Sequence, residues 1–96
     1  MKEFTYKIED PNGMHARPAG MLATFAKRFQ SKIRVLANGK EADGKRLLAL
    51  MSLGAVSNTE LTVLIDGEDE DRAAKELEAF FQNGMRIPDH FKKEEP

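Results

Sequence analysis

The sequence predicts an α+β fold, a two-layer sandwich in which helices cover one face of an antiparallel or mixed sheet. Two observations predict it. Apolar residues alternate with polar ones in some segments and recur every three or four positions in others, in the order βαββαβα. The pair Asn38-Gly39 is a strong signal for a two-residue hairpin, so the strands are expected to be mostly hairpin-linked. With 96 residues the chain has room for one hydrophobic core, and therefore one domain.

The first two elements are a strand and a helix. Phe4, Tyr6 and Ile8 alternate with polar residues, which is typical of a strand with one buried face. The turn-forming residues 10–13 end this strand. From Ala16 the period becomes helical, and two basic residues suit the C-terminal end of this helix. The apolar positions are Ala19, Leu22, Ala23, Ala26 and Phe29, and the basic residues are Lys27 and Arg28.

Three further strands are predicted. Ile33 and Val35 mark one strand, and residues 40–43 are expected to return antiparallel to it across the Asn38-Gly39 turn. The last strand carries alternating apolar residues and is closed by a turn. These are Leu61, Val63 and Ile65, followed by Asp66-Gly67.

The apolar segment 47–54 can be interpreted as a short helix or as a buried strand. It lacks β-branched residues and Gly54 is a typical helix stop, so we favour a helix of about two turns. Its large apolar residues cover too much of a short helix to be buried on one side, so some are expected to be exposed; the alternative is that all belong to the core. They are Leu47, Leu48, Leu50, Met51 and Leu53.

A final helix is predicted after the last strand. Asp69 is expected to cap it, with Glu70 and Asp71 in the first turn, where negative charge suits the helix dipole. Its buried stripe and its end are given by Ala73, Leu77, Phe80 and Phe81, followed by Asn83-Gly84. Residues 85–96 are predicted to be a polar tail with little to anchor it, and we assign no function to His90 in that tail.

The composition excludes several classes of function. A formal net charge of -1 argues against a general nucleic-acid binder. Without cysteine there is no disulfide framework, which fits the cytosol. The N-terminus has no apolar signal core, and no apolar run approaches the roughly 20 residues of a membrane span. We therefore expect a cytoplasmic protein with no nucleic-acid partner and no direct membrane insertion.

The motif Gly13-Met14-His15-Ala16-Arg17-Pro18-Ala19 places a histidine just before the first helix. A helix N-terminus offers unpaired N–H groups and a partial positive charge, so it suits a phosphate. His15 can hold a phosphoryl group there while the backbone and Arg17 neutralise its charge. Pro18 suits the first turn, because its missing N–H costs nothing at that position. The alternative is a purely structural role, in which His15 is a surface histidine that acts as an ordinary helix cap.

Together with Met51-Ser52-Leu53-Gly54, this motif resembles the HPr family, the histidine-containing phosphocarriers of the phosphoenolpyruvate-dependent sugar phosphotransferase system. The resemblance covers roughly residues 1–85 as one phosphocarrier domain and leaves residues 86–96 as a C-terminal tail. It implies an open-faced β-sandwich with a four-stranded antiparallel sheet and three helices on one face.

The resemblance also implies roles. His15 would accept a phosphoryl group on Nδ1 from phospho-enzyme I, as a pros-phosphohistidine, and pass it to the A component of a sugar-specific enzyme II. Ala16, Arg17 and Pro18 would form the phosphate-binding site. Such a carrier is itself modified in each cycle and is not an enzyme; no cofactor and no metal are implied, and a monomer is expected. The partner-docking residues would be Met21, Thr24, Lys27, Leu47, Leu48 and Met51.

Two positions depart from the family pattern. Many relatives carry a regulatory serine, phosphorylated by a kinase, where this chain has Arg46, so that branch of control is predicted to be absent. Gly20 stands where threonine is common, at a cost of up to about 1 kcal/mol in helix propensity.

Three alternatives stay open at this point. The chain could be a paralogue that works as a regulatory docking module, in a nitrogen-related or kinase-coupled phosphotransfer chain. A small hydrolase of the acylphosphatase kind would need a glycine-rich phosphate loop, which the sequence lacks. An RNA-binding α+β domain would need paired aromatic residues on its strands, and these are lacking too.

Overall fold

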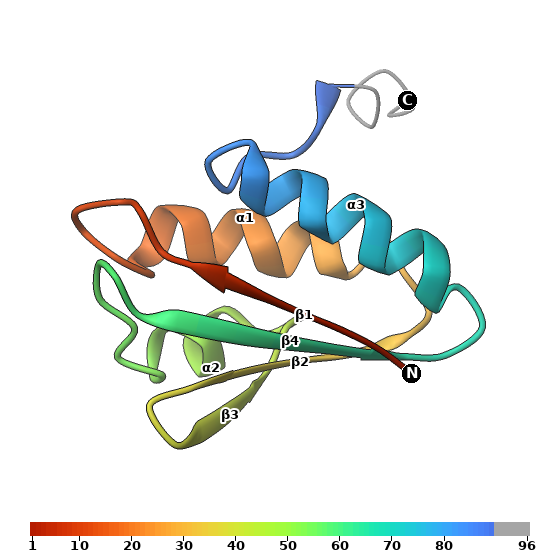
Figure 1. Ribbon diagram of the computed structural model, residues 1–96, viewed down its shortest axis with the longest axis horizontal. Helices are drawn as coiled ribbons and strands as arrows, with labels where there is room; N and C mark the ends of the chain where they lie inside the picture. The colour runs from red at the N-terminus through yellow and green to blue at the C-terminus, as the bar shows by residue number, and fades with distance from the viewer. Residues whose placement is uncertain (90–96) are drawn as a thin grey trace.

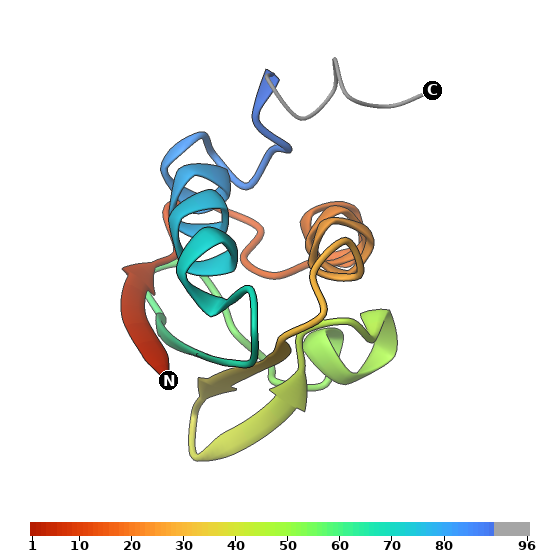
Figure 2. The same ribbon diagram turned by 90° about the vertical axis from the view of Figure 1, so that its right-hand side faces the viewer.

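The computed structural model describes residues 1–89, and their helices and strands follow the predicted order (Figure 1). The elements are β1 (Lys2–Lys7), α1 (Ala16–Ala26), β2 (Lys32–Ala37), β3 (Lys40–Asp43), α2 (Leu47–Met51), β4 (Glu60–Asp66) and α3 (Glu70–Gln82). The strands form one sheet in the order β1-β4-β2-β3, and every neighbouring pair is antiparallel. Helices α1, α2 and α3 lie on one side of this sheet, and the other face is open (Figure 2). The predicted open-faced sandwich is thus confirmed.

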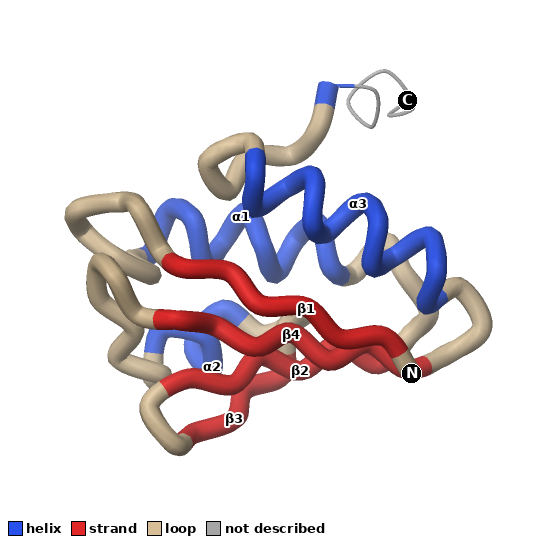
Figure 3. The backbone as a smooth tube through the Cα atoms, in the orientation of Figure 1, coloured by secondary structure: helices blue, strands red, loops and turns tan. Residues whose placement is uncertain are grey.

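The core lies between the sheet and the helices α1 and α3 (Figure 3). Alternate residues of the two central strands are buried and meet across the ladder, as Val35 and Val63 do. The helices contribute aromatic rings: Phe25 of α1 stacks on Phe80 of α3 with a centroid distance of 5.7 Å. The predicted stripe of α3 is buried as expected. Phe29 is also buried, although it lies beyond the end of α1.

One predicted turn is confirmed, and another turn ends a helix earlier than predicted. Asn38 and Gly39 both have positive φ, 55° and 75°, as a type I′ hairpin turn requires. The second helix, α2, spans five residues and is shorter than the two turns predicted. Ser52 and Leu53 form a turn that leads to Gly54, which has φ of 64°.

The predicted cap of α3 is wrong in its bonding. Asp69 does occupy the N-cap position, but its side chain makes no capping hydrogen bond. Its carboxylate instead accepts the backbone N–H groups of Gln30 and Ser31, at 2.8 and 2.9 Å, and the Ser31 hydroxyl. Asp69 therefore joins the start of α3 to the turn that leads into β2.

The segment after α3 also differs from the prediction. Met85 and Pro88 are buried, and Ile87 packs against the core, so this part of the expected tail is anchored. Met85 has φ of 60°, and the N–H of Arg86 donates to the carbonyl oxygen of Phe80. The chain thereby turns back toward α1. His90 lies outside the described residues.

Within residues 1–89, none of the helices combines the length and the apolar character needed to cross a bilayer.

Replacing Asp69 with alanine is expected to lower the free energy of unfolding by about 1 to 3 kcal/mol, because the N–H and hydroxyl of buried Ser31 lose their acceptor. Although desolvation acts to raise the pKa of Asp69, the hydrogen bonds from Ser31 and Gln30 outweigh it and hold this pKa below its ordinary value of 3.8. The contribution of Asp69 to stability is therefore complete above the pKa of the unfolded state. It is lost as the pH falls through the lower pKa of the folded state. Urea unfolding between pH 3 and pH 7 measures this. If the difference in free energy of unfolding between the wild type and the variant does not narrow below pH 3.8, this prediction is contradicted.

Candidate functional site

The loop between β1 and α1 is fixed at both ends by backbone hydrogen bonds. Ile8 exchanges hydrogen bonds with the loop that precedes β4: its N–H donates to Thr59 and its carbonyl oxygen accepts from Asn58. Near the helix, the N–H of Met14 donates to the carbonyl oxygen of Ala55 at 2.8 Å. Met14 itself is buried. The loop is therefore held against the segment before β4.

Gly13 permits this close approach. Its φ is +67°, and a Cβ built on it would lie 2.7 Å from the Cα of Val56 and would also overlap the carbonyl oxygen of Ala55. Both the backbone conformation and the lack of space favour glycine. This glycine sets the position of His15, two residues later.

His15 is the N-cap residue of α1, with extended backbone angles and no capping hydrogen bond from its side chain. Its carbonyl oxygen accepts the N–H of Ala19 at 3.0 Å. In the described part of the chain, the N–H groups of Ala16 and Arg17 donate no hydrogen bond, and Pro18 has no N–H to donate. The predicted start of the helix is confirmed, and its free donors lie beside the histidine.

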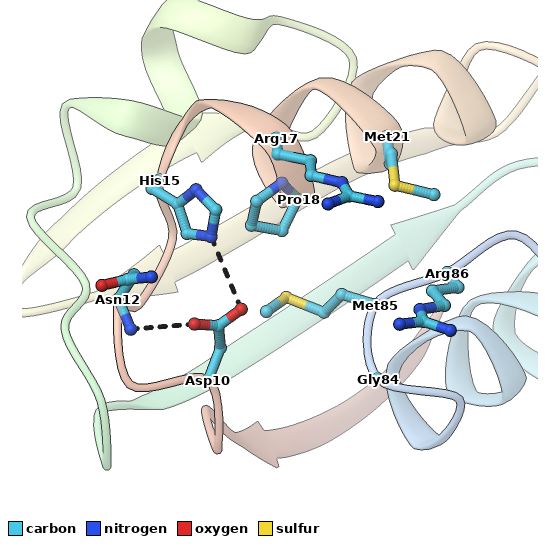
Figure 4. Close-up of a pocket in the computed structure, with 9 residues that line it drawn as sticks. All are labelled: Asp10, Asn12, His15, Arg17, Pro18, Met21, Gly84, Met85 and Arg86. Carbon is cyan, nitrogen blue, oxygen red and sulfur yellow. Dashed lines mark hydrogen bonds and ion pairs between the residues drawn. The ribbon is translucent and has the colours of Figure 1, made fainter.

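The His15 side chain is half-buried and has one hydrogen-bond partner among residues 1–89. Its Nε2 atom lies 3.4 Å from Oδ2 of Asp10. The other oxygen of this carboxylate accepts the backbone N–H of Asn12 at 2.8 Å (Figure 4). Nδ1 makes no hydrogen bond within the described residues and faces away from Asp10.

A pocket of about 470 Å³ opens beside the ring, and two arginines line it (Figure 4). Arg17 comes from the first turn of α1, and Arg86 comes from the segment that follows α3. The pocket combines two guanidinium groups, one carboxylate and one imidazole. Its lining residues are Asp10, Asn12, His15, Arg17, Pro18, Met21, Gly84, Met85 and Arg86.

The pKa of Asp10 lies below its ordinary value. The main cause is the hydrogen bond from the backbone N–H of Asn12, to which His15 adds, while desolvation acts in the opposite direction. Asp10 is thus a carboxylate at neutral pH.

The predicted docking residues lie on α1, directly after it, and on α2. Met21 lines the pocket, Thr24 is exposed on α1, and Lys27, the C-cap residue of this helix, is also exposed. The expectation that part of α2 is exposed is confirmed, since Leu48 is 79% exposed and Leu47 and Met51 are also exposed. The alternative that all large apolar residues of this segment are core is wrong. The ones that face the core are Leu50 and Leu53.

In the part of the chain that the structure describes, no group of three or more His, Cys, Asp or Glu residues lies close enough to hold a metal ion.

Comparison with known proteins identifies the family of the chain. The family profile described as "PTS HPr component phosphorylation site" matches residues 2–83. The chain belongs to the HPr family. As a member of this family, it is an HPr phosphocarrier of the phosphotransferase system.

Individual relatives support the assignment over most of the chain. It is 45% identical over 74 residues to the phosphocarrier protein HPr of Buchnera aphidicola, and the aligned region covers 77% of this chain and 87% of that relative. It is 42% identical over 88 residues to the HPr of Mycoplasma genitalium, which covers 91% of this chain and all of that relative. Among solved structures, a histidine-containing phosphocarrier protein of Mycoplasma matches with a TM-score of 0.84 and 34% identity, covering 90% of this chain and 98% of that one.

The structure brings together residues that the sequence keeps apart. His15, Arg17, Pro18 and Met21 of the predicted site all line the pocket, whereas Ala16 does not. Sequence reasoning missed four others. For Asp10 and Asn12 the sequence predicts a turn and no further role, and the only available signal is their position just before the motif. Met85 and Arg86 carry no local signal, because the fold of residues 84–88 brings them to α1. These four are Asp10, Asn12, Met85 and Arg86.

Replacing Gly13 with alanine is expected to destabilise the protein by more than about 2 kcal/mol, because the new Cβ would collide with Val56 and would occupy a left-handed backbone conformation. Urea unfolding measures the loss. A cost below about 0.5 kcal/mol would mean that the loop moves freely away from Val56.

Gly20 provides the matched control. A Cβ at this position would lie 4.0 Å from Cδ1 of Leu47, an ordinary contact, and the residue is in the middle of α1. Gly20→Ala is therefore expected to raise stability by about 0.5 to 1 kcal/mol, in the opposite direction to Gly13→Ala.

Proposed function

We propose that the chain carries a phosphoryl group on Nδ1 of His15, which it receives from phospho-enzyme I and passes to the A component of a sugar-specific enzyme II. The observation that carries this proposal is the position of His15 at the start of α1, where Nδ1 makes no hydrogen bond among residues 1–89 and the first backbone N–H groups of the helix are free. Family membership supports it.

The charge around the ring suits a bound phosphoryl group. A phosphoryl group on Nδ1 carries up to two negative charges, and the N–H groups at the start of α1 favour them. Arg17 offers a planar pair of donors, and Arg86 brings a second guanidinium to the same pocket. Since the His15 side chain is only half-buried, the group can also leave when the acceptor binds.

The transfer is a displacement at phosphorus. The lone pair of Nδ1 forms the new N–P bond while the bond between phosphorus and the donor breaks, and its electron pair leaves with the donor. The reverse sequence delivers the group to the acceptor. No net turnover occurs without partners, so the protein acts as a stoichiometric carrier and not as an enzyme.

The exposed apolar residues of α2 serve as the docking surface in this proposal. Leu47, Leu48 and Met51 are exposed, and Met21 of α1 lines the adjacent pocket. Apolar residues beside a charged centre suit two partners that bind in turn and leave quickly. Thr24 of α1 and Lys27, directly after the end of this helix, extend the surface. In this account the chain works as a monomer in the cytoplasm.

Arg46 separates this chain from kinase-regulated relatives. It occupies the N-cap position of α2, next to the docking residue Leu47. Arginine cannot accept a phosphoryl group from a protein-serine kinase, and its positive charge is opposite to that of a phosphoserine. We therefore propose a carrier that lacks this form of control.

The experiment is intact-mass spectrometry after incubation with phosphoenolpyruvate and enzyme I. The wild type is expected to gain one acid-labile phosphoryl group, and His15→Ala is expected to gain none because the nucleophile is gone. His90→Ala is the matched control, since it removes the other histidine of the chain and is expected to leave the gain intact.

The result also decides between carrier and docking module. A folded wild-type protein that gains nothing from several enzyme I homologues would contradict the carrier proposal. It would favour the alternative of a regulatory paralogue that acts by docking alone, in a nitrogen-related or kinase-coupled phosphotransfer chain.

A further inference from the structure

We propose that Asp10 is a positioning residue for phosphoryl transfer: its carboxylate holds the proton of the neutral His15 ring on Nε2, which leaves the lone pair on Nδ1 free to accept the phosphoryl group. The inference deepens the proposed function and rests on it.

The two oxygens of Asp10 have different partners. Oδ1 accepts the backbone N–H of Asn12 at 2.8 Å, and Oδ2 lies 3.4 Å from Nε2 of His15. The backbone of Asp10 is also tied into the turn, because its carbonyl oxygen accepts the N–H of Gly13 at 2.9 Å. The carboxylate is thus held in place independently of the histidine.

The chemistry of a carboxylate decides the tautomer. An ionised carboxylate has no proton to donate, so the ring nitrogen that bonds to it must supply the hydrogen. A neutral imidazole carries one N–H, and placing it on Nε2 leaves Nδ1 with the lone pair. The hydrogen bond from Asn12 to Asp10 keeps the carboxyl ionised at neutral pH. The other charged groups of the pocket, Arg17 and Arg86, are donors only and cannot accept that proton.

The same arrangement balances charge after transfer. When Nδ1 forms its bond to phosphorus, the proton stays on Nε2 and the ring becomes cationic. The Asp10 carboxylate faces that cation, while the phosphoryl group sits on the opposite nitrogen. When the group moves on, the N–P electron pair returns to Nδ1. No base has to remove or return a proton in either direction.

Two substitutions of Asp10 test this role, because they distinguish an effect on the tautomer of His15 from an effect on the turn formed by residues 10–13. In Asp10→Asn, the new side chain can keep its amide oxygen toward the N–H of Asn12. Its NH₂ group then points at Nε2 of His15. That donor favours a lone pair on Nε2 and moves the ring proton to Nδ1, where it blocks the nucleophile. Asp10→Ala removes both bonds and leaves a mixture of tautomers.

The measurements are the ¹⁵N chemical shifts of His15, which report the protonated nitrogen of the neutral ring, and the initial rate of phosphorylation by phosphoenolpyruvate and enzyme I. We expect the proton on Nε2 in the wild type and on Nδ1 in Asp10→Asn. The rate is expected to fall in the order wild type, Asp10→Ala, Asp10→Asn, with about a tenfold loss or more in the last.

A merely structural role for Asp10 predicts the opposite order, because asparagine preserves the hydrogen bond to Asn12 and alanine does not. A wild-type ring protonated on Nδ1, or an Asp10→Asn rate equal to or above that of Asp10→Ala, would overturn the inference. If the wild type accepts no phosphoryl group, the proposed function fails, while the ¹⁵N shifts still decide whether Asp10 sets the tautomer. If the wild type is phosphorylated and both variants match its rate, the inference about Asp10 alone fails.

Discussion

The contact between the β1–α1 loop and the segment before β4 is the constraint on which the site depends. Gly13 lies so close to Val56 that no side chain fits between them, and the N–H of Met14 bonds to the carbonyl oxygen of Ala55. These two interactions fix the loop immediately before the helix. They determine that α1 begins after His15, and therefore that free N–H groups and an imidazole meet at one point.

Each part of the site follows from that position. The turn formed by residues 10–13 follows β1 and brings a carboxylate to Nε2 of His15, and α1 begins with free backbone N–H groups directly after this histidine. The packing of Met85 in the core brings Arg86 back toward the first turn of α1. In the proposed function, a donor-rich pocket beside a half-buried histidine would stabilise a phosphoryl group without enclosing it, which suits a reversible carrier.

The sequence was informative where local chemistry decides structure. Alternation predicted the buried faces of β2 and β4, the positive φ values of Asn38 and Gly39 confirmed the hairpin, and the motif around His15 predicted the start of α1. It failed where distant segments compete for a side chain. Asp69 has the right type and position for a cap, but its carboxylate bonds to the turn before β2 instead. No local pattern predicts such a choice.

The same reason explains the residues missed in the pocket. Arg86 is one charged residue in a polar segment, and only the buried neighbours of that segment bring it near Arg17. The pairing of Asp10 with His15 depends on the shape of a turn that contains Gly13 at positive φ. Periodicity describes which face of an element is buried, but it does not describe the path of an irregular loop.

The most direct measurement for the central claim is the NMR spectrum of the phosphorylated protein, labelled with ¹⁵N, in which coupling to ³¹P identifies the nitrogen that carries the phosphoryl group. The account predicts phosphorus on Nδ1 of His15. Phosphorus on Nε2, the nitrogen that faces Asp10, or on any other residue would contradict it.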